Sequence, residues 1–178
     1  VYGSRPWTRT GEDRQVTLER VDPLIDFDWV RNTPGAPISE DDFTVIWTGF
    51  VQPKVTEQHT FEAEADDGVR VWVNDRLVVD QWEEGRPPAE GVDGRIRLSA
   101  QSRYPIRVEY RESKVNASVR VFWSSHNLER EVIPAASLFR SRGSSGGPGL
   151  NAEYTSKQRI LAYTQGAGDL FAIFFEWP

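Results

Sequence analysis

The stretch EADDGVRVWVNDRLVVDQW, residues 64–82, contains the pattern that decides the fold. Val69, Val71 and Val73 alternate with polar or larger residues, and this period of two places the valines on one face of a β-strand. Asn74-Asp75 follows, and two turn-forming residues before another hydrophobic run are typical of a tight β-hairpin. The stretch therefore predicts two antiparallel strands. The adjacent Asp66 and Asp67 need a separate explanation, because like charges repel and aspartate is a poor strand former.

The same period of two continues on both sides of this hairpin. Residues 59–65 place Phe61, Ala63 and Ala65 on one face and two glutamates on the other. Similar runs occur at residues 42–51, 94–100, 103–112 and 117–123. Turn residues separate the runs at intervals of about 8–12 residues, and no segment keeps a helical period of about 3.6. The chain is therefore predicted to be an all-β protein, an antiparallel β-sandwich or barrel with one solvated face on each sheet. Four tryptophans fall in these strand patterns and are predicted to be core residues rather than sugar platforms: Trp29, Trp47, Trp72 and Trp123.

Composition excludes several classes of function. The chain has 178 residues, 38% of them hydrophobic, which suffices for the core of a domain of ordinary size. A net charge of −6 argues against a nucleic-acid partner, which requires a concentrated basic surface. No apolar run approaches the length of about 20 residues that spans a membrane, and no signal peptide opens the chain. There is no cysteine, and His59 and His126 are far apart, so disulfides are excluded and a zinc site is not expected.

Residues 20–140 resemble the protective-antigen domain family, also called the PA14 family. The resemblance is carried by FTVIWTGFVQP (43–53), by the hairpin stretch, by YPIRVEYRES (104–113) and by ASVRVFW (117–123), with IDFDW (25–29) and VIPAASLF (132–139) agreeing at the two ends. It implies an antiparallel β-sandwich of a kind appended to or inserted in glycosidases, adhesins and toxins. Several members of this family bind sugars through calcium.

The two ends resemble a different family, the α-L-fucosidases of glycoside hydrolase family twenty-nine. VYGSRPW (1–7) is similar to the motif that closes their catalytic barrel, and YTSKQRILAYTQGAGDLFAIFFEWP (154–178) to the start of their C-terminal β-domain. The resemblance implies four segments: the barrel tail and a linker at 1–19, the sandwich at 20–140, a flexible linker SRGSSGGPG at 141–149, and the start of a C-terminal β-domain at 150–178. The chain would then be an insert in a fucosidase, with the parent's catalytic domain as a partner.

The PA14 resemblance gives the acid pair a role. In calcium-binding members two adjacent aspartates are joined by a cis peptide and point at one calcium ion, which takes two sugar hydroxyls; Asp66 and Asp67 match this pair. Calcium prefers six to eight oxygen ligands, so converging carboxylates suit it. Glu112 falls where sugar-binding members carry an asparagine ligand. Backbone carbonyls near Lys114 and Asn116 would complete the shell, and these two side chains, with Trp82, Glu84 and Arg86, are the predicted sugar contacts.

Other interpretations remain open at this level. An Asp-Asp-Gly sequence before a strand is often a solvated turn, and the calcium could be purely structural. The domain could be a spacer or interaction domain that shapes the fucosidase entrance or its oligomer without binding free sugar, or it could contribute a loop to the catalytic unit. Retaining glycosidases need two carboxylates about 5–5.5 Å apart, and no such pair can be nominated here. The chain is therefore predicted to be a non-catalytic, calcium-dependent module for fucosylated or related glycans, and its family implies an extracellular or periplasmic location without a membrane partner.

Overall fold

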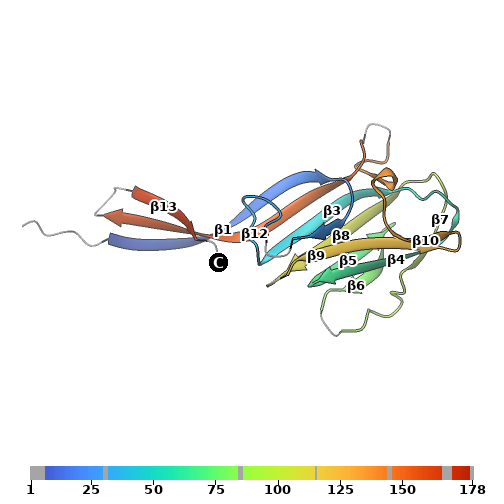
Figure 1. The fold of residues 1–178 in the computed structure, drawn as a ribbon, viewed down its shortest axis with the longest axis horizontal. Coiled ribbons are helices and arrows are strands. Elements are labelled where there is room, and N and C mark those ends of the chain that lie inside the picture. The colour runs from blue at the N-terminus through green and yellow to red at the C-terminus, as the bar shows by residue number, and fades with distance from the viewer. Residues whose placement is uncertain are drawn as a thin grey trace, which may run out of the picture.

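The computed structural model describes residues 7–29, 32–83, 86–114, 116–143, 146–165 and 170–176, with side chains placed between residues 15 and 157 of those ranges. The chain forms two antiparallel sheets that face each other (Figure 1). The described part contains one helical element, the 3-10 helix η1 (Ala135–Ser137). No helix in that part is long and apolar enough to cross a membrane.

The larger sheet has eight strands and the smaller sheet has five. The order of the larger sheet is β1 (Trp7–Asp22), β12 (Leu150–Gln165), β3 (Phe43–Val51), β8 (Tyr104–Glu112), β5 (Gly68–Val73) and β6 (Arg76–Gln81), with β11 (Leu138–Phe139) beside β3 and β13 (Leu170–Glu176) beside β12. The order of the smaller sheet is β10 (Leu128–Val132), β9 (Ser118–Ser125), β4 (Glu57–Asp66) and β7 (Arg95–Leu98), with β2 (Asp26–Asp28) beside β9. The predicted antiparallel sandwich is confirmed.

The predicted hairpin is also confirmed. Strands β5 and β6 pair around Asn74 and Asp75, whose φ angles are 51° and 61°. Asparagine and aspartate tolerate this left-handed region better than most residues, and two successive residues of this kind are the signature of a hairpin turn. The three valines of β5 are completely buried between the sheets, so the period of two read from the sequence matches the faces of the strand.

The same alternation corrects the prediction for one tryptophan. Trp29, Trp47 and Trp123 are buried in the core, as expected. Trp72 is only half-buried and lies on the outer face of the larger sheet. Its neighbours Val71 and Val73 point inward, and successive side chains of a strand point to opposite faces, so Trp72 must point outward.

The sandwich extends beyond the segment 20–140 on both sides. Strand β12 lies between β1 and β3, and Leu150, Ala152 and Tyr154 are buried in the core. Its pairing with β3 stops at Ser156, whereas its pairing with β1 continues to Trp7 and Gln165. Strands β1, β12 and β13 therefore leave the sandwich together as a ribbon, which extends to the left in Figure 1. We call this extension the ribbon arm.

The segment predicted to be a flexible linker makes defined contacts where the structure describes it. The guanidinium of Arg103 donates hydrogen bonds to the carbonyl oxygens of Ser141 (2.9 Å) and Gly143 (2.6 Å). The backbone of Phe139 also forms an isolated bridge with Pro148. These contacts place the start of the segment against Arg103, directly before β8, and its end against β11.

A buried polar network lies within the sandwich, around the end of β1 that is farther from the ribbon arm. Asp22, at the end of β1, is 4% exposed and accepts hydrogen bonds from Arg20 Nε (2.7 Å), Trp47 Nε1 (2.8 Å) and the Tyr154 hydroxyl (2.5 Å). Arg20 also donates to the Tyr154 hydroxyl and to the backbone oxygen of Pro34, both at 2.6 Å. The Asp22 carboxylate therefore ties β1, β3 and β12 together, and Arg20 connects the loop that follows β2 to this network.

Candidate metal and ligand site

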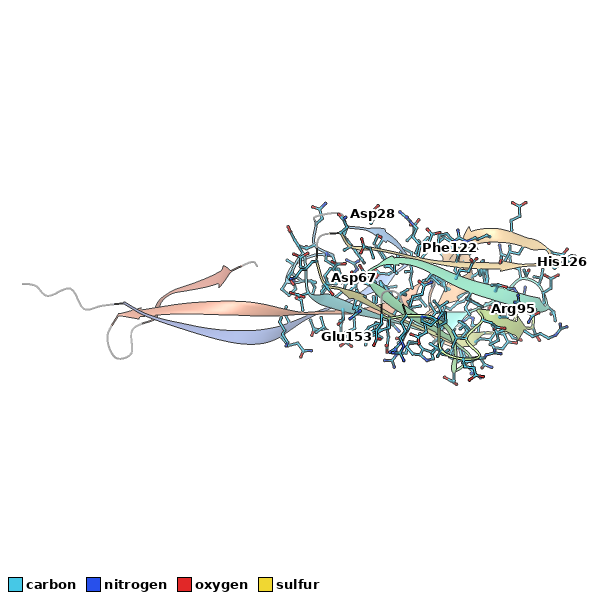
Figure 2. All side chains as sticks on the ribbon, turned by 90° about the horizontal axis from the view of Figure 1, so that it is seen from below. Asp28, Asp67, Arg95, Phe122, His126 and Glu153 are labelled. Atoms are coloured by element: carbon cyan, nitrogen blue, oxygen red, sulfur yellow. The ribbon has the colours of Figure 1, made fainter. Side chains whose placement is uncertain are left out.

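The acid pair lies at the junction between β4, in the smaller sheet, and β5, in the larger one. Asp66 ends β4 opposite Ser118, and Gly68 begins β5 opposite Arg111. The bond between Asp66 and Asp67 is a cis peptide, as the family resemblance implies. Both aspartates are exposed. Figure 2 shows Asp67 at the end of the sandwich from which the ribbon arm extends, and His126 at the opposite end.

Glycine is required directly after the acid pair. A Cβ atom on Gly68 would lie 2.7 Å from Arg111 Nε and 2.8 Å from the backbone oxygen of Trp82. The second of these contacts is with backbone, which cannot move aside as the end of a flexible side chain can. Because Gly68 has no Cβ atom, the backbone directly after the acid pair can pass close to both Arg111 and Trp82.

Glu112 lies beside the acid pair at the end of β8. Its side chain is 3% exposed, and its Oε1 atom is buried without a hydrogen-bond partner. Its Oε2 atom is 3.0 Å from the hydroxyl of Tyr110, and that hydroxyl also donates to the backbone oxygen of Asp66. On the other side, Asp67 Oδ2 accepts a hydrogen bond of 2.7 Å from the backbone N–H of Ser113. Tyr110 and Ser113 thus hold Glu112 and the two aspartates in one cluster.

Burial raises the pKa of Glu112 from its ordinary value of 4.5 to about 7, and the negative charges of Asp67, Asp66 and Asp41 add to this effect against the hydrogen bond with Tyr110. Burial and the charge of Glu112 likewise raise the pKa of Tyr110, so its hydroxyl keeps its proton. A hydroxyl carries one proton and can donate it to one acceptor at a time. A protonated Glu112 can therefore donate to Tyr110 while Tyr110 donates to Asp66.

We expect the free energy of unfolding of the metal-free protein to show this raised pKa. The folded state binds the proton of Glu112 more tightly than the unfolded state does. The stability that this proton contributes is therefore fully present below about pH 4.5 and is lost as the pH rises through about 7, a change of about 3 kcal/mol. Urea unfolding in chelator between about pH 5 and pH 8 measures it, with Glu112→Gln as the control.

The difference between wild type and Glu112→Gln isolates this titration. Burial lowers the pKa of His59. The free energy of unfolding therefore increases as the pH rises and His59 loses its proton, which is opposite to the effect of Glu112. Both proteins contain His59, and its contribution cancels in the comparison. Parallel stability curves for the two proteins would show that Glu112 has an ordinary pKa.

The donor set of the cluster fits a hard cation, although the cluster is incomplete on its own. Carboxylate oxygens are the ligands that calcium prefers, and Glu112 Oε1 is an orphaned buried acceptor beside two further carboxylates. No group of three or more His, Cys, Asp and Glu side chains between residues 15 and 157, where side chains are described, is already arranged to hold a metal ion. A calcium ion would therefore need additional oxygen ligands.

The other predicted contact residues lie on two sides of the acid pair. Lys114 and Asn116 are exposed in the loop between β8 and β9, where Asn116 N–H donates to the Lys114 oxygen (3.2 Å). Trp82 and Arg86 line a small depression next to Gly68, and the guanidinium of Arg111 lies 5.3 Å from the centre of the Trp82 ring. The prediction for Glu84 lies outside the described residues.

Two further residues shape the site and were not singled out from the sequence. Tyr110 joins the Asp66 backbone to Glu112, and Asp41 adds negative charge near Glu112. The alternation along β8 predicts that Tyr110 faces the core. The contact of its hydroxyl with the Asp66 backbone depends instead on the register between β8 and β5. Asp41 lies in the acidic run SEDD before β3, which reaches the site because Phe43 pairs with Glu112.

Comparisons with known proteins agree with this arrangement of strands. A family model described as the PA14 domain matches residues 7–137. The anti-sigma-I factor RsgI3 of Acetivibrio thermocellus is 40% identical over 138 residues, which span 76% of this chain and 21% of that protein. The protective antigen of Bacillus anthracis is 28% identical over 98 residues, which span 53% of this chain and 12% of that protein.

A solved structure also resembles this chain in sequence and fold. The anti-sigma factor domain-containing protein from Clostridium clariflavum is 34% identical and superposes with a TM-score of 0.63, covering 73% of this chain and 45% of that chain. The present chain thus spans less than half of each of these relatives.

Proposed function

Because the chain belongs to the PA14 domain family, we propose that it is a calcium-dependent carbohydrate-binding module. The observation that carries this proposal is the buried, unpaired Oε1 of Glu112 beside the carboxylates of Asp66 and Asp67. A buried carboxylate oxygen without a partner is costly, and a cation would both neutralise the cluster and satisfy that oxygen. The resemblance supports the proposal, because it implies that the calcium-binding members of the family hold calcium and sugar through a matching acid pair.

In this proposal each residue has a separate task. The carboxylates of Asp66, Asp67 and Glu112 hold the calcium ion, and backbone carbonyls near Lys114 and Asn116 add ligands. Bound calcium would supply coordination for sugar hydroxyls. The hydrogen bond from Ser113 N–H keeps one oxygen of Asp67 in place, so that side chain is already oriented before the metal arrives.

Sugar selectivity would come from the side chains around the ion. Lys114 and Asn116 are exposed on one side, and Trp82 and Arg86 share a small depression on the other. Glu84 remains a predicted contact. An aromatic ring offers a face for the apolar side of a sugar, while the charged and amide groups bond to its hydroxyls.

The parent context is a further proposal. The flanking motifs resemble an α-L-fucosidase, and the pairing of β1 with β12 brings the two flanks side by side, as an inserted domain requires. The motif VYGSRPW lies outside the described residues apart from the backbone of Trp7. The relatives above carry this domain in an anti-sigma factor and a protective antigen instead. We infer a non-catalytic module that targets its parent glycosidase to fucosylated glycans outside the cell, in the extracellular space or periplasm.

Calorimetry of the chain with calcium, and then with L-fucose and other monosaccharides, tests the proposal. We expect one calcium ion to bind and sugar binding to disappear in chelator. Sugar binding that persists unchanged in chelator at this site, or no calcium binding, would contradict it.

One observation favours a second candidate function, a metal-stabilised spacer. The acid pair lies at the end of the sandwich where the ribbon arm begins (Figure 2). Calcium there would stiffen the connection to neighbouring domains without contacting free sugar. Calcium binding without any monosaccharide binding would favour this candidate.

A further inference from the structure

A row of outward-facing residues crosses five strands of the larger sheet, away from the acid pair. The strand register places Val21, Asn151, Thr48, Arg107 and Trp72 next to one another on β1, β12, β3, β8 and β5. Val21 is 45% exposed, the Arg107 side chain is 51% exposed and Trp72 is half-buried. Neighbouring strands are about 4.8 Å apart, so the row is about 19 Å long. We call it the cross-strand row.

The cross-strand row is the floor of two adjoining depressions. The larger, of about 690 Å³, is lined by Trp72, Arg107, Thr48 and Asn151, and the smaller, of about 370 Å³, by Val21 together with the same Thr48 and Asn151. Because they share two residues, the depressions form one groove perpendicular to the strands. The volume of each depression is in the range of ligand-binding clefts.

The chemistry of the groove suits an uncharged ligand rich in hydroxyl groups. Arg107 forms an ion pair with Glu109, so donors and acceptors lie side by side without an excess of charge. Arg140 and Asp75 add one charge of each sign to the larger depression. The smaller depression is also lined by Arg20, Glu19 and Glu153, so the groove as a whole has one more acidic than basic side chain. The Trp72 ring gives the groove an aromatic surface. The guanidinium of Arg107 lies 5.8 Å from the centre of this ring, so polar groups lie beside the aromatic surface.

Other classes of ligand fit this surface less well. A nucleic acid would require a concentrated basic surface, and this groove has no excess of basic side chains. A protein partner requires an apolar interface core, and among the described side chains Val21 is the single exposed large hydrophobic one.

We propose that this groove binds a neutral polysaccharide chain, with its sugar rings laid along the cross-strand row. Arg107 is five residues from Glu112 on β8, a separation of about 17 Å, so this site is distinct from the acid pair. None of the residues of the row is a proposed calcium ligand. Binding in the groove therefore does not require calcium, and it stands or falls separately from the calcium site.

Native affinity electrophoresis in chelator tests the proposal on the full chain. The probes are three soluble neutral polymers, an arabinoxylan, a mixed-linkage β-glucan and a galactomannan, with alginate as a charged polymer. We expect at least one neutral polymer to retard the chain. Trp72→Ala should weaken that binding about tenfold and Asn151→Ala about threefold, whereas Trp72→Phe should keep most of it.

A second variant and a second measurement separate this site from the other one. Asp66→Asn/Asp67→Asn should leave binding in chelator unchanged. If Trp72→Ala fails to fold, amide shifts of the wild-type chain in an NMR titration with the same polymer still locate the site, and they should cluster at Thr48, Arg107 and Asn151. Retardation by none of the neutral polymers, stronger retardation by alginate, or shifts confined to residues 66–68 and 113–117 would overturn the proposal.

Discussion

Replacing Asp22 by alanine is expected to lower the free energy of unfolding by about 4 kcal/mol. Three donors converge on this one carboxylate, from Arg20, Trp47 and Tyr154. Removing it leaves a buried indole N–H and a buried hydroxyl without their acceptor and leaves the partly buried Arg20 without its counter-charge. Such orphaned groups cost more than the hydrogen bonds themselves contribute.

Urea unfolding followed by tryptophan fluorescence measures this loss, and Asp26→Ala is the matched control. Asp26 also accepts a hydrogen bond from an arginine, Arg120, but its side chain is 46% exposed, so its removal should cost less than about 1 kcal/mol. Asp22→Asn should fall between the two, because the amide keeps an acceptor oxygen but has no charge for Arg20. Equal losses for Asp22→Ala and Asp26→Ala would mean that the network does not hold β1, β3 and β12 together.

The second large effect is expected at the acid pair. Asp66→Asn/Asp67→Asn should lower calcium affinity by at least about 100-fold, because the change removes two charged oxygen ligands while keeping the size of the side chains. The amide oxygen of residue 67 could still accept the hydrogen bond from Ser113 N–H, so the loop should keep its position. In the wild type, calcium at about 100 times its dissociation constant should stabilise the fold by about 2.7 kcal/mol.

The control changes the same charge on the same strand. Glu62 and Glu64 are exposed on β4, four and two residues before Asp66, and both form ion pairs with Arg130. Glu62→Gln/Glu64→Gln should therefore retain both calcium affinity and the stabilisation of the fold by calcium. If both double variants lost calcium binding equally, a diffuse effect of net charge would explain it, and the acid pair would be an ordinary solvated turn.

The strands and their faces could be predicted from the sequence because they depend on local alternation. Val69, Val71 and Val73 alternate over one strand, and burial between two sheets follows directly from that pattern. The turn at Asn74-Asp75 is equally local. The acid pair could be found because its residues are adjacent in the sequence and match a family pattern.

Features that depend on pairing between distant strands could not be predicted in this way. Strand β12 fits between β1 and β3, although about 100 residues of chain separate it from β3. The contact of Tyr110 with Asp66 and the cross-strand row both follow from register, which a single sequence does not specify. Trp72 is a different case, because the local alternation of β5 already places it opposite the buried valines and its hydrophobicity suggested the wrong face.

The pairing of the ribbon arm has a mechanical consequence. Trp7 and Gln165 lie opposite each other at its tip, and Glu176 pairs with Arg159. Tension applied at the two ends of the chain would peel β13 away and then open the β1–β12 ladder from the tip inward, loading its hydrogen bonds one after another rather than all together. Strands that unzip in this way yield at low force. The arm would therefore lengthen before the load reached Asp22, and it would act as an extensible tether that protects the sandwich.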